Sequence, residues 1–408
     1  MIIKQYIKDF ENLGFGMFVH FGIYSVLGKG EWAKDIHGIS DEDYFPLSKQ
    51  FNPDKNWAPD LVKVAKNAGC KYITLTTRHH DGFSLYDTCG LNDFDAPHCC
   101  GRDLVREFVD ACRAEGIIPF FYHTLLDWYV ESYKTDFKAY LKYLRDSVEL
   151  ICTNYGKIGG IWFDGMWDKK DEDWEEDALY GMIRSHQPEA MIINNTGLHA
   201  LGALGHIELD SVTFERGKPQ PINMEGSPKY VASEMCEVMA DHWGYAREDL
   251  NFKSTAQMIK ELAECRRYGA NMLMNVGPRE DGSVRPIDAA ILGVMGEWVS
   301  YFEEAIRTPR PTQIEIENKP DDFVLQDGDN YYLFCTDLPM AGSLNVALIE
   351  GGHFQDTFVF DRKVKSVTWM DNGEAAEFEQ KDGKLTVHTH PFKYGRSLVV
   401  RVAKIVCE

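Results

Sequence analysis

Short apolar runs alternate with longer amphipathic segments through the first three quarters of this 408-residue chain, and few folds accept that pattern. The apolar runs have the length of buried strands and lie at 17–25, 72–78, 117–124, 160–165, 190–195 and 271–277. The amphipathic segments between them are typical of helices and lie at 57–69, 102–116, 134–154, 172–186 and 254–269. Near-continuous apolar strands separated by helices indicate a parallel sheet covered by helices. We therefore predict an α/β fold, a (β/α)8-like TIM-type barrel, with no strand assigned in the irregular stretch 196–250.

After Arg307 the sequence changes character. The run TPRPTQ at 308–313 has the proline content of a linker, and several short alternating runs beyond it end in Asp-Gly or Asn-Gly turns. Such runs are typical of a small all-β domain. We therefore predict a barrel over 1–307 and a C-terminal β-sandwich domain over 312–408. Core packing, rather than carbohydrate binding, is the expected role of its scattered aromatic residues, which are Tyr331, Tyr332, Phe334 and Trp369.

The charge of the chain argues against two classes of partner. It has 43 basic and 64 acidic residues, for a net charge of −21. Such a surface repels nucleic acid and anionic membranes, and no stretch approaches the roughly 20 apolar residues that span a membrane. A neutral substrate such as a sugar is compatible with this charge. We expect neither nucleic acid nor a membrane as a partner, and the sequence gives no indication of an oligomeric state.

Two features bear on the compartment. Residues 1–16 carry charges at Lys4, Lys8, Asp9 and Glu11, and they lack the apolar run of a signal peptide. The 10 cysteines form no Cys-x-x-Cys pair and no zinc-ribbon spacing. We expect mostly reduced thiols and a cytoplasmic protein. A secreted or periplasmic protein whose leader has been removed would show the same sequence.

Polar residues stand at the ends of four consecutive predicted strands. In a parallel barrel these ends meet at one rim, where the active site lies. The residues are His20, His79, His80, Asp81, Tyr122, His123 and Asp164. Any one of them could simply cap the next helix, but their coincidence on one rim favours a functional site.

Asp164 is the most informative of these residues. It follows the apolar run 159–163 and precedes Gly165, so its carboxylate is held at the tip of a buried strand. It could instead cap the following helix, although other aspartates downstream suit that role better. Trp162 and Trp167 are close in sequence, and aromatic rings stack on the apolar face of a sugar. A carboxylate in these surroundings suits attack on an anomeric carbon, and hence glycoside cleavage.

The His79-His80 pair raises the alternative of a metal site. Adjacent residues on a strand point to opposite faces, so the two cannot easily bind one ion. The sequence also has no HExxH pattern and no evident set of two histidines and one carboxylate. We therefore expect no metal, and hydrogen bonding to hydroxyl groups as the role of both residues. Asp81 could also fix the His80 imidazole within a turn.

At these residues the chain closely resembles the α-L-fucosidases of glycoside hydrolase family 29. The matching segments occur in the family's order over roughly residues 1–306, and they are FGMFVHFGIYS (15–25), GEWAKD (30–35), KYITLTTRHHDGFSLYDT (71–88), GRDLVREFVDACRAEGI (101–117), FYHTLLDW (121–128), IWFDG (161–165), HWGY (242–245) and NMLMNVGPREDGSV (271–284). A single HHDG motif carries little weight, whereas the ordered set is specific. The resemblance implies a fucose-type pocket, a retaining double displacement, and neither a metal nor an organic cofactor.

The resemblance also implies roles position by position. Asp164 matches the nucleophile, and Trp243 stands where the family places an aromatic ring near the sugar methyl group. Glu215, within ELDSVTFERG (208–217), matches the general acid/base of many members, and Glu234 is the alternate candidate. The residues that match the lining of the fucose pocket are His20, Glu31, Trp32, His79, His80 and Tyr122, and Trp162 is expected beside them.

One segment departs from the family's pattern. After the fifth strand many relatives carry an arginine, in a pattern like Asn-Asp-Arg, whereas this chain reads Asn194-Asn195-Thr196. Either Arg216 replaces that arginine or the pocket is less cationic.

The expected function is therefore that of a retaining exo-glycosidase, an α-L-fucosidase that releases terminal fucose from oligosaccharides or glycoconjugates. One alternative is a catalytically weak fucose-binding barrel. Another is a glycosidase for a related sugar such as α-L-galactose, because an apolar wall rejects an added hydroxyl only modestly. The loops around the pocket, rather than the pocket itself, are expected to set the linkage preference.

Overall fold

The computed structural model describes residues 1–317, 319–340 and 354–408. The chain forms two compact units, which comprise Met1–Lys253 with Asn271–Gly293, and Ser254–Ala270 with Val294–Glu408. These units divide the chain at positions other than those of the expected domains, 1–307 and 312–408. The expected domain ranges stay a prediction. Within the described residues, no helix is long and apolar enough to cross a membrane.

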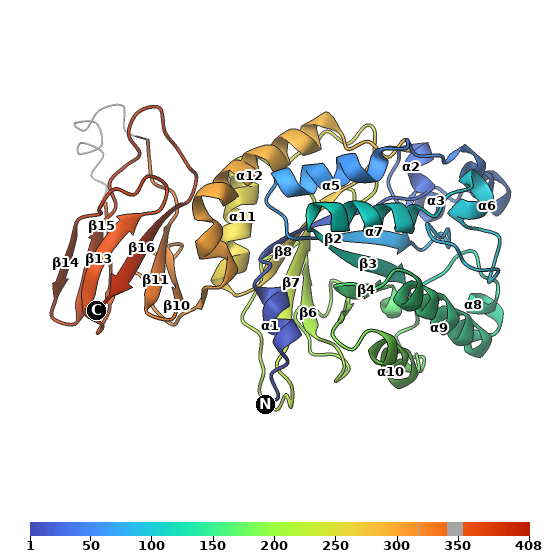
Figure 1. Ribbon diagram of the computed structural model, residues 1–408, viewed down its shortest axis with the longest axis horizontal. Helices are drawn as coiled ribbons and strands as arrows, with labels where there is room; N and C mark the ends of the chain where they lie inside the picture. Colours follow the sequence, from blue (N-terminus) through green and yellow to red (C-terminus); the bar gives the residue numbers. More distant parts are fainter. Residues whose placement is uncertain (318, 341–353) are drawn as a thin grey trace. The chain divides into compact units, whose positions relative to one another are not determined.

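Eight parallel strands close into a barrel in the first unit, which confirms the predicted fold class (Figure 1). They are β1 (Phe15–Val19), β2 (Tyr72–Arg78), β3 (Ile118–Thr124), β4 (Gly160–Asp164), β5 (Met191–Asn194), β6 (Ser211–Glu215), β7 (Ala232–Glu237) and β8 (Asn271–Val276). Each strand pairs with the next in chain order, and β8 closes the barrel by pairing with β1. Because all strands are parallel, their carboxyl ends share one rim.

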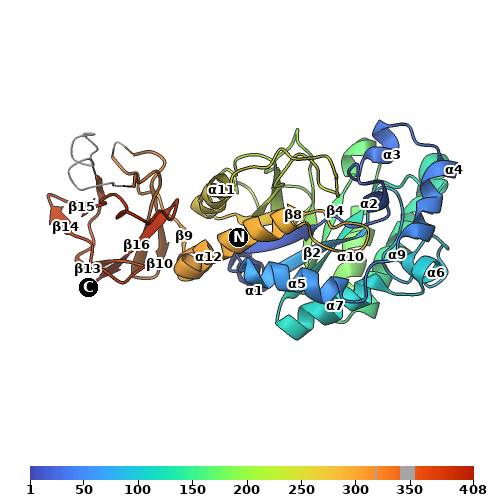
Figure 2. The same cartoon turned by 90° about the horizontal axis from the view of Figure 1, so that it is seen from above.

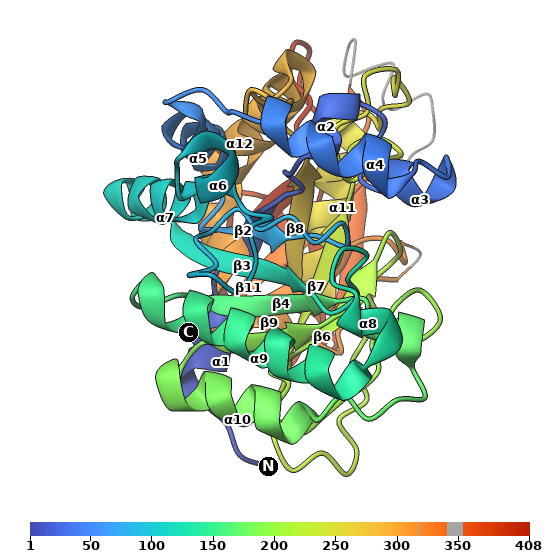
Figure 3. The ribbon, with the colours of Figure 1, turned by 90° about the vertical axis from the view of Figure 1, so that its right-hand side faces the viewer.

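Helices follow most of these strands in the chain. The longer ones are α5 (Trp57–Asn67), α7 (Leu104–Glu115), α9 (Phe137–Asn154), α10 (Glu176–His186), α11 (Thr255–Arg267) and α12 (Pro286–Arg307). The short ones are α1 (Gln5–Glu11), α2 (Tyr24–Leu27), α3 (Ala33–Ile36), α4 (Asp41–Tyr44), α6 (Ala96–Cys100) and α8 (Ser132–Thr135), with the 3-10 helices η1 (Phe45–Gln50) and η2 (Met166–Lys169). Figure 2 shows α5 beside α7, and Figure 3 shows α9 beside α10. Each of these four helices buries an apolar stripe and leaves its other face to solvent.

Strands β6 and β7 lie in the stretch where the sequence predicted none. Polar and apolar residues mix in both, as SVTFE and ASEMCE, so neither strand has the apolar run that marks β1, β3 and β4. All of these residues except Glu215 are nevertheless buried. The segments 196–210 and 216–231, which are fully described, contain no helix. Between β5 and β7 the barrel therefore departs from the regular alternation of strand and helix.

The first predicted strand, 17–25, was too long. Strand β1 ends at Val19, and residues Tyr24–Leu27 form α2 instead. Val19 is the last residue of β1 paired with β2 and with β8, so the chain leaves the sheet where both neighbours stop supporting it. His20 thus lies immediately beyond the strand, on the rim.

Aromatic side chains fill the barrel interior. The ring centroids of Phe18 and Trp162 lie 5.2 Å apart, and Tyr122 stacks on Trp162 at 5.7 Å. Gly16 has no room for a side chain, because a Cβ atom there would lie 2.4 Å from the Tyr72 ring. Phe10 of α1 packs on the same Tyr72 ring at 5.6 Å and closes the amino-terminal end of the barrel. The cavity of the barrel therefore opens at the carboxyl ends of the strands.

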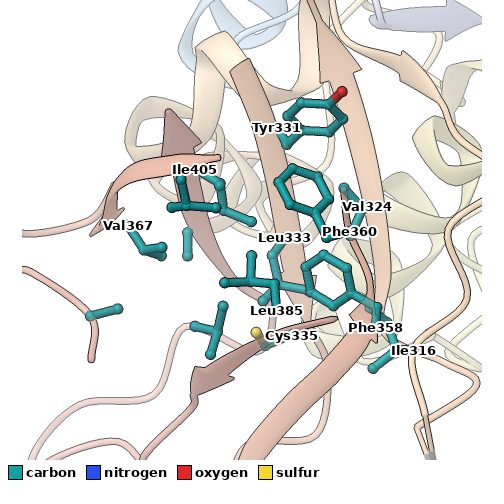
Figure 4. Packing of buried hydrophobic residues seen from close by; sticks show 14 of the residues in the cluster. Ile316, Val324, Tyr331, Leu333, Cys335, Phe358, Phe360, Val367, Leu385 and Ile405 are labelled. Atoms are coloured by element: carbon teal, nitrogen blue, oxygen red, sulfur yellow. The ribbon is translucent and has the colours of Figure 1, made fainter. Parts of the chain in front are cut away.

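The second unit contains two antiparallel sheets that bury one core between them. One has the order β13 (Val364–Trp369), β16 (Arg401–Cys407), β11 (Asn330–Cys335), β10 (Phe323–Asp327) and β9 (Arg310–Pro311), and the other has the order β12 (Gln355–Val359), β15 (Lys384–His388) and β14 (Phe378–Lys381). Figure 4 shows Leu333 and Val324 of the first sheet packed with Phe358 and Leu385 of the second. The aromatic residues that the sequence assigned to the core are buried, namely Tyr331, Tyr332, Phe334 and Trp369.

Candidate active site

A cavity of about 370 Å³ lies at the carboxyl ends of the barrel strands. Its lining residues are Phe18, His20, Glu31, Trp32, His79, Tyr122, Trp162, Asp164, Trp167, Asn195, Gly197, Leu198, His199, Glu215, Cys236 and Trp243. The structure thus brings together ten of the residues singled out in the sequence, Trp167 among them. Two others, His80 and Glu234, lie just behind the lining. Asn195 and the segment 197–199 line the cavity although the sequence assigned them no role.

Asp164 is held by donors from three directions. The Tyr122 hydroxyl donates to its Oδ2 atom at 3.0 Å. Its Oδ1 atom accepts from Trp167 Nε1 at 3.3 Å and from Asn195 Nδ2 at 3.2 Å. Burial and the nearby Asp164 charge raise the pKa of Tyr122 well above its ordinary value, so this hydroxyl keeps its proton and donates. Among the described residues, no lysine or arginine pairs with Asp164, so neutral groups orient this carboxylate.

Glu215 also lines the cavity, and its carboxylate shares a donor with that of Asp164. Asn195 Nδ2 donates to Glu215 Oε2 at 2.7 Å as well as to Asp164 Oδ1 at 3.2 Å. The two acceptor oxygens can therefore lie no further apart than the sum of these two lengths. Burial raises the pKa of Glu215, the Asn195 hydrogen bond partly offsets this, and the Asp164 charge raises it further. A carboxyl group with a raised pKa is suited to donate a proton.

Histidines at the rim present nitrogen lone pairs. His20 Nδ1 lies 2.7 Å from Asn275 Oδ1, and the Asn275 amide nitrogen donates elsewhere, to Trp243 O. His20 therefore carries its hydrogen on Nδ1, which leaves Nε2 as an acceptor. Burial lowers the pKa of His20 to about 3, so the ring stays neutral at ordinary pH.

His80 follows the same logic. Its Nδ1 atom lies 2.7 Å from Thr124 Oγ1, and that hydroxyl donates to Leu126 O, so His80 Nδ1 is the donor. Its Nε2 atom lies 3.5 Å from Asp164 Oδ2. Burial lowers the pKa of both His79 and His80. Hydrogen bonding of His79 and His80 to hydroxyl groups stays a prediction. The Nε2 atoms of His20 and His80 carry lone pairs, so both act as hydrogen-bond acceptors.

Two other residues from the strand ends serve the scaffold. Asp81 accepts from the Tyr44 hydroxyl at 2.9 Å and from Phe83 N at 3.1 Å, and the partner of the His80 Nδ1 atom is Thr124. The expectation that Asp81 fixes the His80 imidazole is therefore wrong. His123 is fully buried, and it does not line the cavity.

Glu234 lies inside the barrel beneath the cavity. Its carboxyl group accepts from Trp162 Nε1 at 3.0 Å and from the Tyr72 hydroxyl, and the residue is 1% exposed. Both of these partners belong to the aromatic packing of the barrel. Burial raises the pKa of Glu234 to about 7. This placement fits a residue that supports the cavity floor, and Glu215 is the better-placed acid/base candidate.

The raised pKa of Glu234 predicts a pH-dependent stability. Folded chains hold this proton between pH 4.5 and about 7, whereas unfolded chains release it, so wild-type stability falls as the pH rises through this window. Glu234→Gln mimics the neutral acid and removes that dependence. We expect the variant to gain on the order of 2 kcal/mol relative to wild type between pH 4.5 and pH 7.5. Urea denaturation of both proteins at both pH values measures their free energies of unfolding. If the variant and wild type differ by the same free energy at both pH values, the buried position of Glu234 is contradicted.

Aromatic rings and one buried acid form the walls. Trp32 packs against both the His80 and the Trp128 ring, with ring centroids 5.1 Å and 5.4 Å away. Trp243 packs 5.2 Å from the His20 ring. Glu31 accepts from Gly244 N at 2.7 Å, so it fixes the turn that carries Trp243. An apolar wall with acceptors set into it is suited to bind a monosaccharide that has one apolar edge.

The only described group of three residues that could hold a metal ion lies in the second unit, and comprises Asp322, Cys335 and Asp356. The cavity itself presents three carboxyl groups, from Glu31, Asp164 and Glu215, together with histidines and aromatic walls.

A barrel whose rim holds two carboxylates on one shared amide, in a pocket walled by aromatic rings, has the architecture of a glycoside hydrolase. Comparison with known sequences gives the family. The family model described as alpha-L-fucosidase matches residues 3–304, and the chain belongs to this family.

Individual relatives agree with this assignment. The tissue alpha-L-fucosidase of Bos taurus is 30% identical over 353 residues, which cover 76% of this chain and 70% of that protein. The solved structure of alpha-L-fucosidase isoenzyme 1 from Paenibacillus thiaminolyticus has a TM-score of 0.83 and 27% identity, and the match covers 99% of both chains. A Bacteroides thetaiotaomicron alpha-L-fucosidase, solved as a trapped covalent intermediate, shares the fold with a TM-score of 0.83 and 22% identity, over 99% of this chain and 96% of that one.

Proposed function

We propose that this protein is a retaining exo-α-L-fucosidase in which Asp164 is the nucleophile and Glu215 the general acid/base. The observation that carries the proposal is the amide nitrogen of Asn195, which bonds both carboxylates at 3.2 Å and 2.7 Å. Retaining glycosidases hold their carboxyl groups about 5–5.5 Å apart, whereas inverting enzymes need about 6.5–9.5 Å to admit a water molecule. The shared donor keeps the two oxygens below the inverting range.

The reaction proceeds in two displacements. Asp164 attacks the anomeric carbon of a terminal α-L-fucose, the glycosidic bond breaks, and Glu215 transfers its proton to the leaving oxygen. Water then attacks the anomeric carbon of the fucosyl-Asp164 ester and gives a proton to Glu215, which restores both residues. The Bacteroides thetaiotaomicron relative was trapped as a covalent intermediate with 2-fluoro-fucosyl fluoride in a Glu-to-Gln variant, which supports the same sequence of steps here.

The walls of the cavity fit fucose for two reasons. His20 lines the cavity and presents an acceptor nitrogen, and a sugar hydroxyl can donate to it. Trp243 supplies an apolar surface at the position that the family resemblance assigns to the 6-methyl group of fucose. Phe18, Tyr122 and Trp162 close the cavity from below, so only a terminal residue can enter.

The configuration of the first product tests this proposal. We expect wild-type protein to release α-L-fucose from 4-nitrophenyl α-L-fucoside before mutarotation, as followed by ¹H NMR. Initial β-L-fucose would contradict the retaining mechanism. A parallel panel of α1,2-, α1,3-, α1,4- and α1,6-linked fucosyl oligosaccharides defines the linkage preference.

Two further results would favour other functions. Binding of fucose by folded protein without release from any member of the panel would favour a sugar-binding barrel. Faster hydrolysis of 4-nitrophenyl α-L-galactoside than of the fucoside would favour the related sugar.

A further inference from the structure

We infer that Asn195 is a positioning residue that holds Asp164 and Glu215 at their working separation and fixes which oxygen of Glu215 carries the catalytic proton. This inference rests on the proposed function. Asn195 follows β5, so it stands on the rim between the strand that ends in Asp164 and the strand that ends in Glu215. Its side chain is buried, at 4% exposure, yet its amide lines the cavity.

The contacts of Asn195 define the orientation of its amide. The Oδ1 atom accepts from Gly197 N at 3.3 Å and from the Thr213 hydroxyl at 3.2 Å. A backbone N–H can only donate, so the atom that faces Gly197 must be the carbonyl oxygen. The opposite orientation would aim that oxygen at two carboxylates and the amide hydrogens at another N–H group. The NH2 group therefore faces Asp164 and Glu215, with one hydrogen for each.

This orientation determines the place of the proton. An amide NH2 group only donates, so Glu215 Oε2 accepts from Asn195 whether Glu215 is protonated or ionised. The proton that Glu215 gives to the leaving oxygen must then sit on Oε1. The same atom takes the proton back from water in the second step. Asn195 can thus keep both hydrogen bonds through the whole cycle.

Among the described residues, the other groups near the pair bond to at most one of the two carboxylates. Beyond Asn195, the groups that act on Glu215 are Asp164, Arg216, Glu237 and the Cys236 thiol, and those that face Asp164 are His80, Tyr122 and Trp167. Arg216 was the sequence candidate to replace the arginine of the relatives, but it is exposed and does not line the cavity. Asn195 is the described residue that bonds to both carboxylates. Because it is neutral, it links them without the strong pKa lowering of a nearby cation.

The test compares Asn195→Ala with the neighbouring Asn194→Ala. Asn194 is also a buried asparagine, but its amide donates to the Tyr180 hydroxyl at 3.1 Å and it does not line the cavity. We measure kcat/KM against pH for 4-nitrophenyl α-L-fucoside and for a fucosyl oligosaccharide. Asn195→Ala should lose about 10²- to 10³-fold on the oligosaccharide and less on the nitrophenyl substrate, which needs little protonation of its leaving group. The basic limb should move to higher pH, because the lost hydrogen bond lowered the pKa of Glu215.

The control Asn194→Ala should keep the wild-type pH profile. If Asn195→Ala does not fold, Thr213→Val removes one of the two donors that orient the amide, and it should shift the basic limb in the same direction. Equal losses on both substrates with unshifted limbs would overturn the inference and leave the proposed function intact. A wild-type protein that is folded but inactive on both substrates would overturn the proposed function and, with it, this inference.

Discussion

Asp164→Ala should lower kcat for 4-nitrophenyl α-L-fucoside by at least about 10⁴-fold without unfolding the protein. The variant lacks the oxygen that forms the fucosyl ester, so the first displacement has no nucleophile. Tyr122, Trp167 and Asn195 lose a shared acceptor, so some loss of stability accompanies the change. Initial rates with and without sodium azide measure the effect. Azide should restore part of the activity by direct attack and give β-L-fucosyl azide, the inverted product.

Asp168→Ala is the matched control for this variant. Asp168 lies four residues further along the chain, is exposed, and accepts from the Tyr133 hydroxyl at 2.6 Å outside the cavity. We expect its activity to stay near that of wild type. Near-normal activity of Asp164→Ala, or a comparable loss in Asp168→Ala, would contradict the assignment of the nucleophile.

Glu215→Ala should produce a loss that depends on the leaving group. We expect kcat/KM for a fucosyl oligosaccharide to fall by about 10³- to 10⁴-fold, because the sugar alcohol needs a proton to depart. The loss in the first step should be smaller for 4-nitrophenyl α-L-fucoside. The basic limb of the pH profile, which reports loss of the Glu215 proton, should disappear. Azide should attack the fucosyl-enzyme and give α-L-fucosyl azide, the retained product.

Glu234→Gln distinguishes the two glutamates. It should show no rescue by azide and should keep the basic limb, because Glu234 bonds to Trp162 and Tyr72 beneath the cavity. Azide rescue in Glu234→Gln, together with none in Glu215→Ala, would reverse the assignment. The anomer of the azide product distinguishes a nucleophile from an acid/base, because Asp164→Ala should give the β-azide and Glu215→Ala the α-azide.

The sequence predicted those site residues that lie at the carboxyl ends of recognisable strands. Strands β3 and β4 are marked by apolar runs, and β2 by β-branched and aromatic residues, so the residues at or after their ends, such as His79, Tyr122 and Asp164, could be placed on one rim. The interior of a barrel need not be apolar where side chains bond to one another. Glu234 is buried in β7 with Tyr72 and Trp162 as donors, so its strand carries no apolar signal.

The role of Asn195 could not be read from the chain. Its neighbours Asp164 and Glu215 lie 31 and 20 residues away, and only the closure of the barrel brings all three together. Asn195 is a polar residue that follows β5, so the strand-end rule applies to it, but the departure from the family pattern draws attention to the missing arginine instead. Histidine tautomers are likewise set by partners such as Asn275, which is distant in sequence from His20.

Covalent trapping tests the central claim most directly. Glu215→Gln protein is incubated with 2-deoxy-2-fluoro-α-L-fucosyl fluoride, whose fluoride leaves without a proton while the 2-fluoro group slows hydrolysis of the ester. Peptide mapping by mass spectrometry then locates the label. We predict one fluorofucosyl group per chain, on the peptide that contains Asp164, and none in the Asp164→Ala, Glu215→Gln double variant. A label on any other carboxylate, or steady release of the sugar without a labelled peptide, would contradict Asp164 as the nucleophile of a retaining fucosidase.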